Sequence, residues 1–245
     1  FALDHDEGQF DGYLKRYGTF AGTGITSFRM PSNLQYIAPE TFRNCEQLKT
    51  FYIGKAFRGK INYGEEGDPD TLFLYYAPIR LIQIDKENTS YQLQNEILYT
   101  RDGHILCQAL KNDNADSQLT IPSCVTEIAD GAFYRNSEFG AIEVKGSLER
   151  IGISAFACAD VGSFYVKGGV NYLDRGSFYQ SAISEWRCHG GVKKYEKSAF
   201  QDVDATNGYA IDMNAITKLY QELLYVNATT DLSYWVKTIW NWIIM

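Results

Sequence analysis

Two consecutive blocks of equal length decide the fold of this chain: LERIGISAFACADVGSFYVKGG at residues 148–169 and VNYLDRGSFYQSAISEWRCHGG at residues 170–191. Each block begins with an aliphatic residue, carries a small residue before the Phe at its ninth position, and ends in Gly-Gly. Self-similarity at a fixed period is typical of proteins that build one structural unit per copy. The chain is therefore expected to contain further copies of this unit.

The repeat runs through four complete blocks. A Phe that follows a small residue returns every 22 or 23 residues, at Phe133, Phe156, Phe178 and Phe200. The aliphatic residues that open the blocks keep the same spacing, at Val125, Leu148, Val170 and Val192. Two interrupted copies place Phe42 and Phe73 in the equivalent position, and an incomplete first copy begins at Ile25. Phe and aliphatic residues that keep the same spacing over so many copies indicate a structural repeat.

Within each block, the apolar residues indicate two short strands. The second half of a block reads Val161-x-x-Phe164-x-Val166, and its final alternation has the period of a half-buried strand. The same pattern occurs as Leu48-x-x-Phe51-x-Ile53, Ile79-x-x-Ile82-x-Ile84 and Ile183-x-x-Trp186-x-Cys188. A coil of this length cannot bury its own apolar face, whereas stacked coils cover one another. The sequence therefore predicts a mostly β solenoid of roughly six coils, with the Phe residues in an internal ladder and Trp186 in the core.

These residues resemble the BspA-type (Treponema pallidum-type) leucine-rich repeat, whose pattern is roughly "sLtsItIP.sVtsIgdyAF.gC". The match is close in LTIPSCVTEIADGAF (119–133), and TFRNCEQLKTFYI (41–53) carries the Phe, Cys and Leu positions. The stretch ENTSYQLQNEILYTRDGHIL (87–106) is similar to the hairpin insertion of that family, and LLYVNATTDLSYWVKTIWNWI (223–243) is similar to its closing strand and short helix. The resemblance implies a leucine-rich-repeat solenoid over roughly residues 25–245.

The expected organisation has three parts. Residues 1–24 form an N-terminal segment or cap, residues 25–203 form the solenoid, and residues 204–245 form an irregular last coil with a cap made of a strand and a short helix. Insertions are expected at about 54–72 and 87–118. A cap is required because an open solenoid end exposes bare core and an unpaired sheet edge. Phe1 is not an initiator residue, which fits a removed export signal or an engineered boundary.

Composition excludes several kinds of partner. The 245 residues carry a formal net charge of −7, which argues against binding to a phosphate backbone. The sequence contains no run of 18 apolar residues, so no membrane-spanning helix is expected. The five Cys are an odd number without a CxxC pair, which argues against a complete disulfide framework and against a zinc site. We expect buried, unpaired thiols and neither a metal nor a cofactor.

The sequence shows no set of residues that is expected to form an active site. The three His (His5, His104 and His189) are expected on different coils, too far apart to serve one nucleophile. A glycan-acting enzyme would need two carboxylates about 5–10 Å apart, and the place for them would be a cleft between the 54–72 and 87–118 insertions. Glu65, Glu66, Asp68 and Asp70 cluster in one loop, where solvation explains them. The calcium-like fragments at 4–7 and 112–117 are incomplete, and the sequons at Asn88 and Asn227 matter only in a eukaryotic secretory pathway.

The remaining candidate site is a surface. Between the last two inward positions of each second strand, one residue points outward; the expected stripe is Tyr52, Gln83, Glu143, Tyr165 and Arg187. The next outward positions add Gly54, Asp85, Lys145, Lys167 and His189. A row that mixes Tyr with Arg, Lys and acids is typical of a protein- or glycan-binding face. An ordinary solvated strand face has a similar composition, so both interpretations stay open.

The resemblance implies an exported or surface-anchored protein of a host-associated bacterium, with a role in adhesion. We therefore expect a non-catalytic binding module outside the cell or on its surface, and a lipid anchor on a removed N-terminal segment would fit. The alternative is a spacer or scaffold without a ligand of its own, and a glycan-binding or glycan-acting protein is the third hypothesis. A spacer would lack a contiguous aromatic patch of several hundred Å². The oligomeric state is open.

Overall fold

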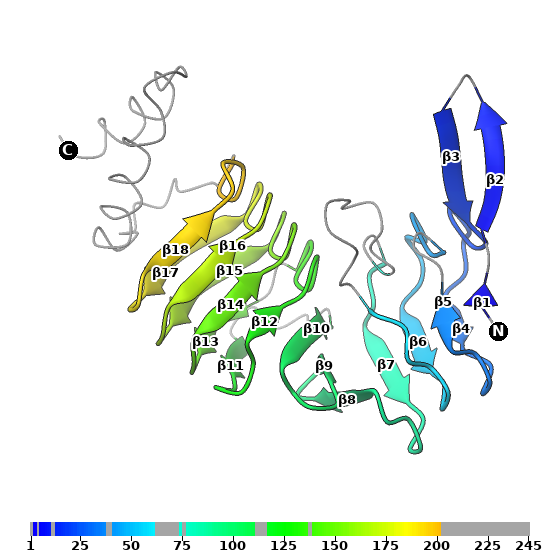
Figure 1. The fold of residues 1–245 in the computed structure, drawn as a ribbon, viewed down its shortest axis with the longest axis horizontal. Helices are drawn as coiled ribbons and strands as arrows, with labels where there is room; N and C mark the ends of the chain where they lie inside the picture. Colours follow the sequence, from blue (N-terminus) through cyan, green and yellow to red (C-terminus); the bar gives the residue numbers. More distant parts are fainter. Residues whose placement is uncertain are drawn as a thin grey trace.

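The computed structural model describes residues 2–3, 5–10, 13–37, 41–61, 74, 77–110, 117–136 and 139–201, with side chains from residue 19 onward. All regular structure in this part of the chain is β. The strands lie side by side along the long axis of the molecule, one coil after another (Figure 1). This arrangement confirms the predicted mostly β solenoid.

One wall of the solenoid contains a seven-stranded sheet, made of the first strand of each C-terminal coil and of two inserted strands. Its order is β18-β16-β14-β12-β10-β9-β8, and β8, β9 and β10 pair antiparallel while the others pair parallel. The strands are β8 (Tyr91–Gln94), β9 (Ile97–Thr100), β10 (Ile105–Ala109), β12 (Glu127–Ile128), β14 (Leu148–Ile151), β16 (Val170–Leu173) and β18 (Val192–Tyr195).

The opposite wall consists of the second strand of each coil and is divided into two parallel sheets. The first is β4 (Ser27–Arg29), β6 (Thr50–Ile53) and β7 (Leu81–Ile84). The second is β11 (Ser117–Ile121), β13 (Phe139–Val144), β15 (Asp160–Val166) and β17 (Ala182–Cys188). Each of these strands belongs to one coil, so the described residues form about seven turns, one more than the roughly six expected.

Two small sheets lie at the N-terminal end. Strand β1 (Ala2–Leu3) pairs with β5 (Tyr36–Ile37), and β2 (His5–Phe10) forms an antiparallel hairpin with β3 (Tyr13–Gly18). This hairpin stands out from the stack in Figure 1. The predicted C-terminal strand and helix, the loop acids at 65–70 and the anchor Phe73 all lie outside the described residues.

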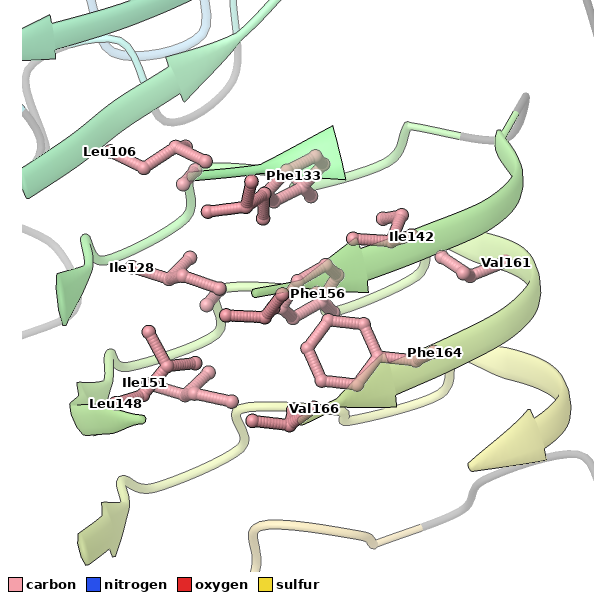
Figure 2. Packing of buried hydrophobic residues seen from close by; sticks show 14 of the residues in the cluster. Leu106, Ile128, Phe133, Ile142, Leu148, Ile151, Phe156, Val161, Phe164 and Val166 are labelled. Carbon is pink, nitrogen blue, oxygen red and sulfur yellow. The ribbon is translucent and has the colours of Figure 1, made fainter. Parts of the chain in front are cut away.

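The predicted Phe ladder is present. Phe133 and Phe156 stack with ring centroids 4.6 Å apart, and Phe156 and Phe178 follow at 5.0 Å. Phe178 and Phe200 continue the ladder at 5.1 Å with nearly parallel rings. Figure 2 shows Phe133 and Phe156 one above the other, surrounded by aliphatic side chains from both walls. Each ring therefore covers the ring of the next coil, which explains why every block needs a Phe at this position.

The turn that carries each Phe explains the small residue before it. The amide N–H of Phe133 donates to the carbonyl of Ala155, and that of Phe156 donates to the carbonyl of Ser177, each at 2.7 Å. Such close backbone approach leaves no room for a larger side chain, and Ala132, Ala155, Ser177 and Ala199 are all fully buried. Two residues before and two after the Phe, the backbone is left-handed, as at Ser154 and Cys158. The repeated turn therefore selects small residues at fixed offsets.

The antiparallel strands β8, β9 and β10, here called the hairpin wall, separate two hydrophobic cores. Ile97 and Tyr99 pack in the core of the C-terminal coils, whereas Leu98, between them, packs in the core of the N-terminal coils. Strand β10 repeats this division, with Leu106 in the C-terminal core and Cys107 in the N-terminal core. Because side chains alternate along a strand, this hairpin presents an apolar surface to both sides. It is a shared wall between two solenoid halves.

Buried polar groups fasten the hairpin to residues 54–61. The amide nitrogen of Asn88 donates to the carbonyls of Gly54 and Phe57 at 2.8 and 3.1 Å, and its oxygen accepts from the N–H groups of Ser90 and Tyr91 at 2.9 and 3.0 Å. The hydroxyl of Tyr91 donates to the carbonyl of Gly59. Asn88 is only 3% exposed, so its sequon presents no accessible amide in the folded chain. The second sequon, at Asn227, lies outside the described residues.

None of the five Cys is in a disulfide, but not all of them are buried. Cys45, Cys107 and Cys188 are buried, and the burial of Trp186 in the core is also as expected. Cys124 is exposed and Cys158 is half-buried, so the prediction of buried thiols is wrong for these two. Both lie in turns between strands, where a side chain can leave the stack without disturbing it.

Candidate functional site

Three of the predicted surface residues lie in register on the second sheet. Glu143 of β13 is the direct partner of Tyr165 of β15, and Tyr165 is the direct partner of Arg187 of β17. The residues on either side of each point inward; Phe164 and Val166, for example, are fully buried. The alternation that was read from the sequence therefore holds on this sheet, and the three side chains form one row across the strands.

The next outward positions carry cationic and aromatic side chains. Lys145 forms an ion pair with Glu143 at 2.5 Å, and Arg187 forms one with Glu185 two residues earlier. The ring of His189 meets the ring of Tyr165 edge to face, with centroids 5.6 Å apart. Lys167 lies between the positions of Lys145 and His189 and is exposed. The face is therefore a polar surface with one aromatic pair, held on a rigid parallel sheet.

Tyr52 and Gln83 belong to the other sheet of the same wall. They pair with each other across β6 and β7, and Arg29 of β4 extends their row. The two sheets are not hydrogen-bonded to each other, because the hairpin wall is inserted between β7 and β11. The expected single stripe of five residues is therefore divided into one row on β4, β6 and β7 and another on β13, β15 and β17.

Tyr52 is the centre of a small polar cluster. Its hydroxyl donates to Asp85 at 2.9 Å, and the guanidinium of Arg29 lies 3.9 Å from the centroid of its ring. The N–H of Glu87 and the Tyr52 hydroxyl, both donating to Asp85, lower the pKa of that carboxyl, and the same bond to Asp85 raises the pKa of Tyr52. Arg29, Tyr52 and Asp85 line a depression of about 330 Å³ together with Met30, Pro31 and Ser32.

Gly54 does not belong to the exposed face. It is buried, and a Cβ at this position would lie 2.9 Å from the carbonyl oxygen of Pro31. The expectation that Gly54 points outward is therefore wrong. The chain turns inward after Ile53, because residues 54–61 pass beneath the hairpin and are hydrogen-bonded to Asn88 and Tyr91.

A second depression, of about 530 Å³, lies where a catalytic cleft would be expected, between residues 54–61 and the hairpin. Among its described lining residues, Asp102 is the only carboxylate, and Arg58 and Arg101 are the charged groups that accompany it. The described part of this cleft therefore lacks the carboxylate pair that glycoside hydrolysis requires.

Other catalytic and metal sites find no support in the described residues. His104 lies on the turn of the hairpin wall, where its Nδ1 is 3.6 Å from Asp102, whereas His189 follows β17. The described part of the chain contains no group of three His, Cys, Asp or Glu residues placed to hold a metal ion. Within the same residues, no helix is long and apolar enough to cross a membrane.

Two residues of these rows were missed by the sequence analysis. Arg29 extends the row of Tyr52, and Thr120 of β11 is the direct partner of Glu143. The alternation that identifies outward positions is also present in FRMP (28–31) and LTIP (119–122). The first and third residues of each stretch align with the inward-facing positions of the other strands. Extending the outward position to these incomplete copies would have identified both residues.

Two solved structures are similar to this chain. The crystal structure of the pneumococcal vaccine antigen PcpA matches with a TM-score of 0.52 at 14% identity, over 82% of this chain and 66% of that one. A leucine-rich repeat protein from Eubacterium ventriosum matches with a TM-score of 0.41 at 16% identity, over 76% of this chain and 66% of that one. This chain thus spans just under two thirds of each. No curated protein matches its sequence.

The family comparison agrees with the repeat and with the Phe ladder. The model of the BspA type leucine rich repeat region matches six copies in the chain, at residues 16–63 and 103–207. These ranges contain β4 to β6 and β10 to β18, and they leave out the acidic loop together with β7, β8 and β9. The chain belongs to the BspA-type leucine-rich repeat family.

Proposed function

We propose that this chain is a non-catalytic binding module of an exported or cell-surface bacterial protein, and that it mediates adhesion by binding a protein ligand. The ligand face is the outer surface of β13, β15 and β17. The single observation that carries the proposal is the row of Glu143, Tyr165 and Arg187, held in register by parallel strands over a fully buried core. Lys145, Lys167 and His189 extend it.

The family supports the protein-binding part of the proposal, since leucine-rich repeat proteins typically act as interaction modules. A parallel sheet fixes the spacing of its outward side chains, so a partner can be recognised without reorganising the backbone. The similarity to a pneumococcal vaccine antigen supports, by analogy, a position at the cell surface. A polar and charged face favours a partner that is recognised by complementary charge more than by apolar contact.

A spacer without its own ligand is the second candidate. Among the described residues, the exposed large apolar side chains are Tyr36, Leu81 and Leu93, and they lie on β5, β7 and β8. The proposed face therefore carries no exposed apolar patch of the kind that often marks an interface. This observation favours the spacer and makes a direct binding test necessary.

The test is a binding screen of the purified chain against immobilised extracellular-matrix proteins and glycans. Two double variants test the two sheets of the outer wall separately. One combines Tyr165→Ala with Arg187→Ala on β15 and β17, and the other combines Tyr52→Ala with Gln83→Ala on β6 and β7. We expect a ligand that the first variant loses and the second retains, with both variants folded as judged by circular dichroism. Loss only in the second variant would move the site to β6 and β7, and the absence of any ligand would favour the spacer.

A further inference from the structure

The depression between residues 54–61 and the hairpin wall is distinct from the strand face. It is lined by the backbone segment that includes Arg58 on one side and by β8 and β9 on the other. Its volume of about 530 Å³ falls in the range of about 300–1,000 Å³ that is usual for small-ligand sites. The depression lies where the two solenoid halves meet, because the hairpin belongs to both cores.

The floor of the depression is held rigidly. Tyr91 is 2% exposed and its hydroxyl accepts from the N–H of Ile61 at 3.2 Å while donating to the carbonyl of Gly59. Its ring stacks on Phe57 with centroids 6.0 Å apart. Asn88 fastens the same segment with four hydrogen bonds. The walls of the depression are therefore fixed before any ligand arrives, which lowers the entropic cost of binding.

Arg58 and Arg101 are the cationic residues among the described lining of this site. Arg58 and Arg101 are both exposed, and neither forms an ion pair with any residue that the structure describes. The one carboxylate of the lining, Asp102, accepts from the Thr100 hydroxyl at 2.6 Å and from the N–H of His104 at 3.1 Å. These two bonds lower the pKa of Asp102 and engage its Oδ1. Within the described residues neither guanidinium is engaged by a carboxylate, and the described lining carries a net positive charge in a chain of net charge −7.

Four hydroxyl residues also line the depression, and the hydroxyls of Tyr91 and Thr100 already donate within the chain. The described contacts assign no hydrogen-bond partner to the hydroxyls of the other two, Thr89 and Ser90. Ser90 uses its backbone instead, with its N–H donating to Asn88 and its carbonyl accepting from Arg101. Arginine pairs with sulfate and carboxylate groups through parallel N–H bonds, and neutral hydroxyls serve the hydroxyl groups of sugars.

We propose that this depression binds the acidic group of a glycan, with Arg58 and Arg101 on the oxyanion and Thr89 and Ser90 on neighbouring sugar hydroxyls. Sulfate and carboxylate share the chemistry that the two guanidiniums recognise. The site is independent of the protein-binding face on β13, β15 and β17, and its ligand is a saccharide.

Isothermal titration calorimetry tests the site with three probes: a heparin-derived tetrasaccharide for sulfate, 3′-sialyllactose for carboxylate, and lactose as the neutral control. We expect the wild-type chain to bind at least one acidic probe and not lactose. Arg58→Gln with Arg101→Gln should weaken that binding about tenfold or more, because both charged hydrogen-bond donors are lost. Lys49→Gln with Lys193→Gln, which removes the same charge from two exposed lysines elsewhere, should change it by less than about twofold.

The outcomes separate this proposal from the proposed function. The acidic probe that binds identifies the oxyanion, and the Tyr165→Ala, Arg187→Ala variant should bind it as the wild type does. An equal loss in the two charge-matched variants would reduce the effect to net charge and overturn the site. Failure of both acidic probes to bind the wild type would overturn it as well, and neither result would bear on the strand face.

Discussion

Leu98 and Tyr99 are consecutive residues of β9, yet they are buried in different hydrophobic cores. Leu98 packs with the N-terminal coils and is fully buried; Tyr99 packs with the C-terminal coils and is 4% exposed. The hairpin wall is thus buried on both faces. Each solenoid half depends on it to close its core, because a coil can be covered only by its neighbour.

The two faces of the wall can be tested separately. Leu98→Ala should lower the free energy of unfolding by about 2–5 kcal/mol through a cavity in the N-terminal core, and Ile97→Ala should do the same in the C-terminal core. Hydrogen exchange should show faster exchange first at amides of β6 and β7 for Leu98→Ala, and of β13 and β15 for Ile97→Ala.

Leu93 provides the matched control for this pair. It lies on the neighbouring strand β8 of the hairpin wall but is 39% exposed, so Leu93→Ala should cost less than about 1 kcal/mol. If Leu98→Ala and Ile97→Ala deprotected the same amides, the wall would not divide two cores.

Asn88 should contribute to stability far more than its neighbours in the sequon. Asn88→Ala leaves two carbonyls and two N–H groups without their partner, and each buried group left unsatisfied costs about 1–3 kcal/mol. We expect a clear fall in the thermal midpoint for this variant, and nearly none for Thr89→Ala, whose side chain is exposed. Equal midpoints for the two variants would contradict the fastening role of Asn88.

Arg150 should stabilise the stack across three coils. It donates to Glu127 at 2.9 Å and to Asp174 at 2.9 Å, and it also contacts Asp130, so these acids keep its pKa raised despite burial. Arg150→Ala would leave three carboxylates facing one another, and the expected cost is about 3–5 kcal/mol in urea unfolding.

The control for Arg150 is Lys193→Ala, which removes one positive charge from the exposed side of β18. Its cost should be within about 0.5 kcal/mol. If Arg150→Ala lowered the free energy of unfolding by no more than Lys193→Ala, the three carboxylates would be stabilised by solvent and not by Arg150.

The ionisation of Tyr99 should make the free energy of unfolding depend on pH in the alkaline range. Burial, with a smaller effect of Cys124, raises the pKa of Tyr99 from 10.0 to about 12. A raised pKa means that the unfolded chain loses this proton first, so the contribution is complete below pH 10 and is lost as the pH rises toward 12. Tyr99→Phe should therefore lose less stability than the wild type between pH 8 and pH 11 in urea unfolding, and an equal loss would show that Tyr99 ionises freely.

Much of the fold could be predicted because the same packing requirement recurs at the same position in every copy of the repeat. The spacing of Phe133, Phe156 and Phe178 was sufficient for the ladder, and the alternation around Trp186 was sufficient for its burial. The outward position of Tyr165 and Arg187 followed from the same alternation. These features depend on contacts between equivalent positions of neighbouring coils, which the period of the sequence records directly.

The division of the outer wall could not be predicted in this way. Ile97, Leu98 and Tyr99 form a continuous apolar run, and a run without alternation does not say which face packs against which partner. The sequence showed that Tyr52 and Tyr165 occupy equivalent positions, but not that a hairpin separates their sheets. Gly54 was assigned to the surface for a similar reason, because its burial depends on the path of residues 54–61 and not on the repeat.

If the face of β13, β15 and β17 binds the ligand, a bound partner must cover its side chains. Hydroxyl-radical footprinting of the chain, alone and with the strongest protein binder from the matrix panel, detects this coverage. We expect protection of Tyr165 and His189, which meet on this face, and unchanged oxidation of Tyr172 and Tyr195 on the opposite sheet. Protection of Tyr172 and Tyr195 with Tyr165 and His189 unchanged would contradict binding at this face.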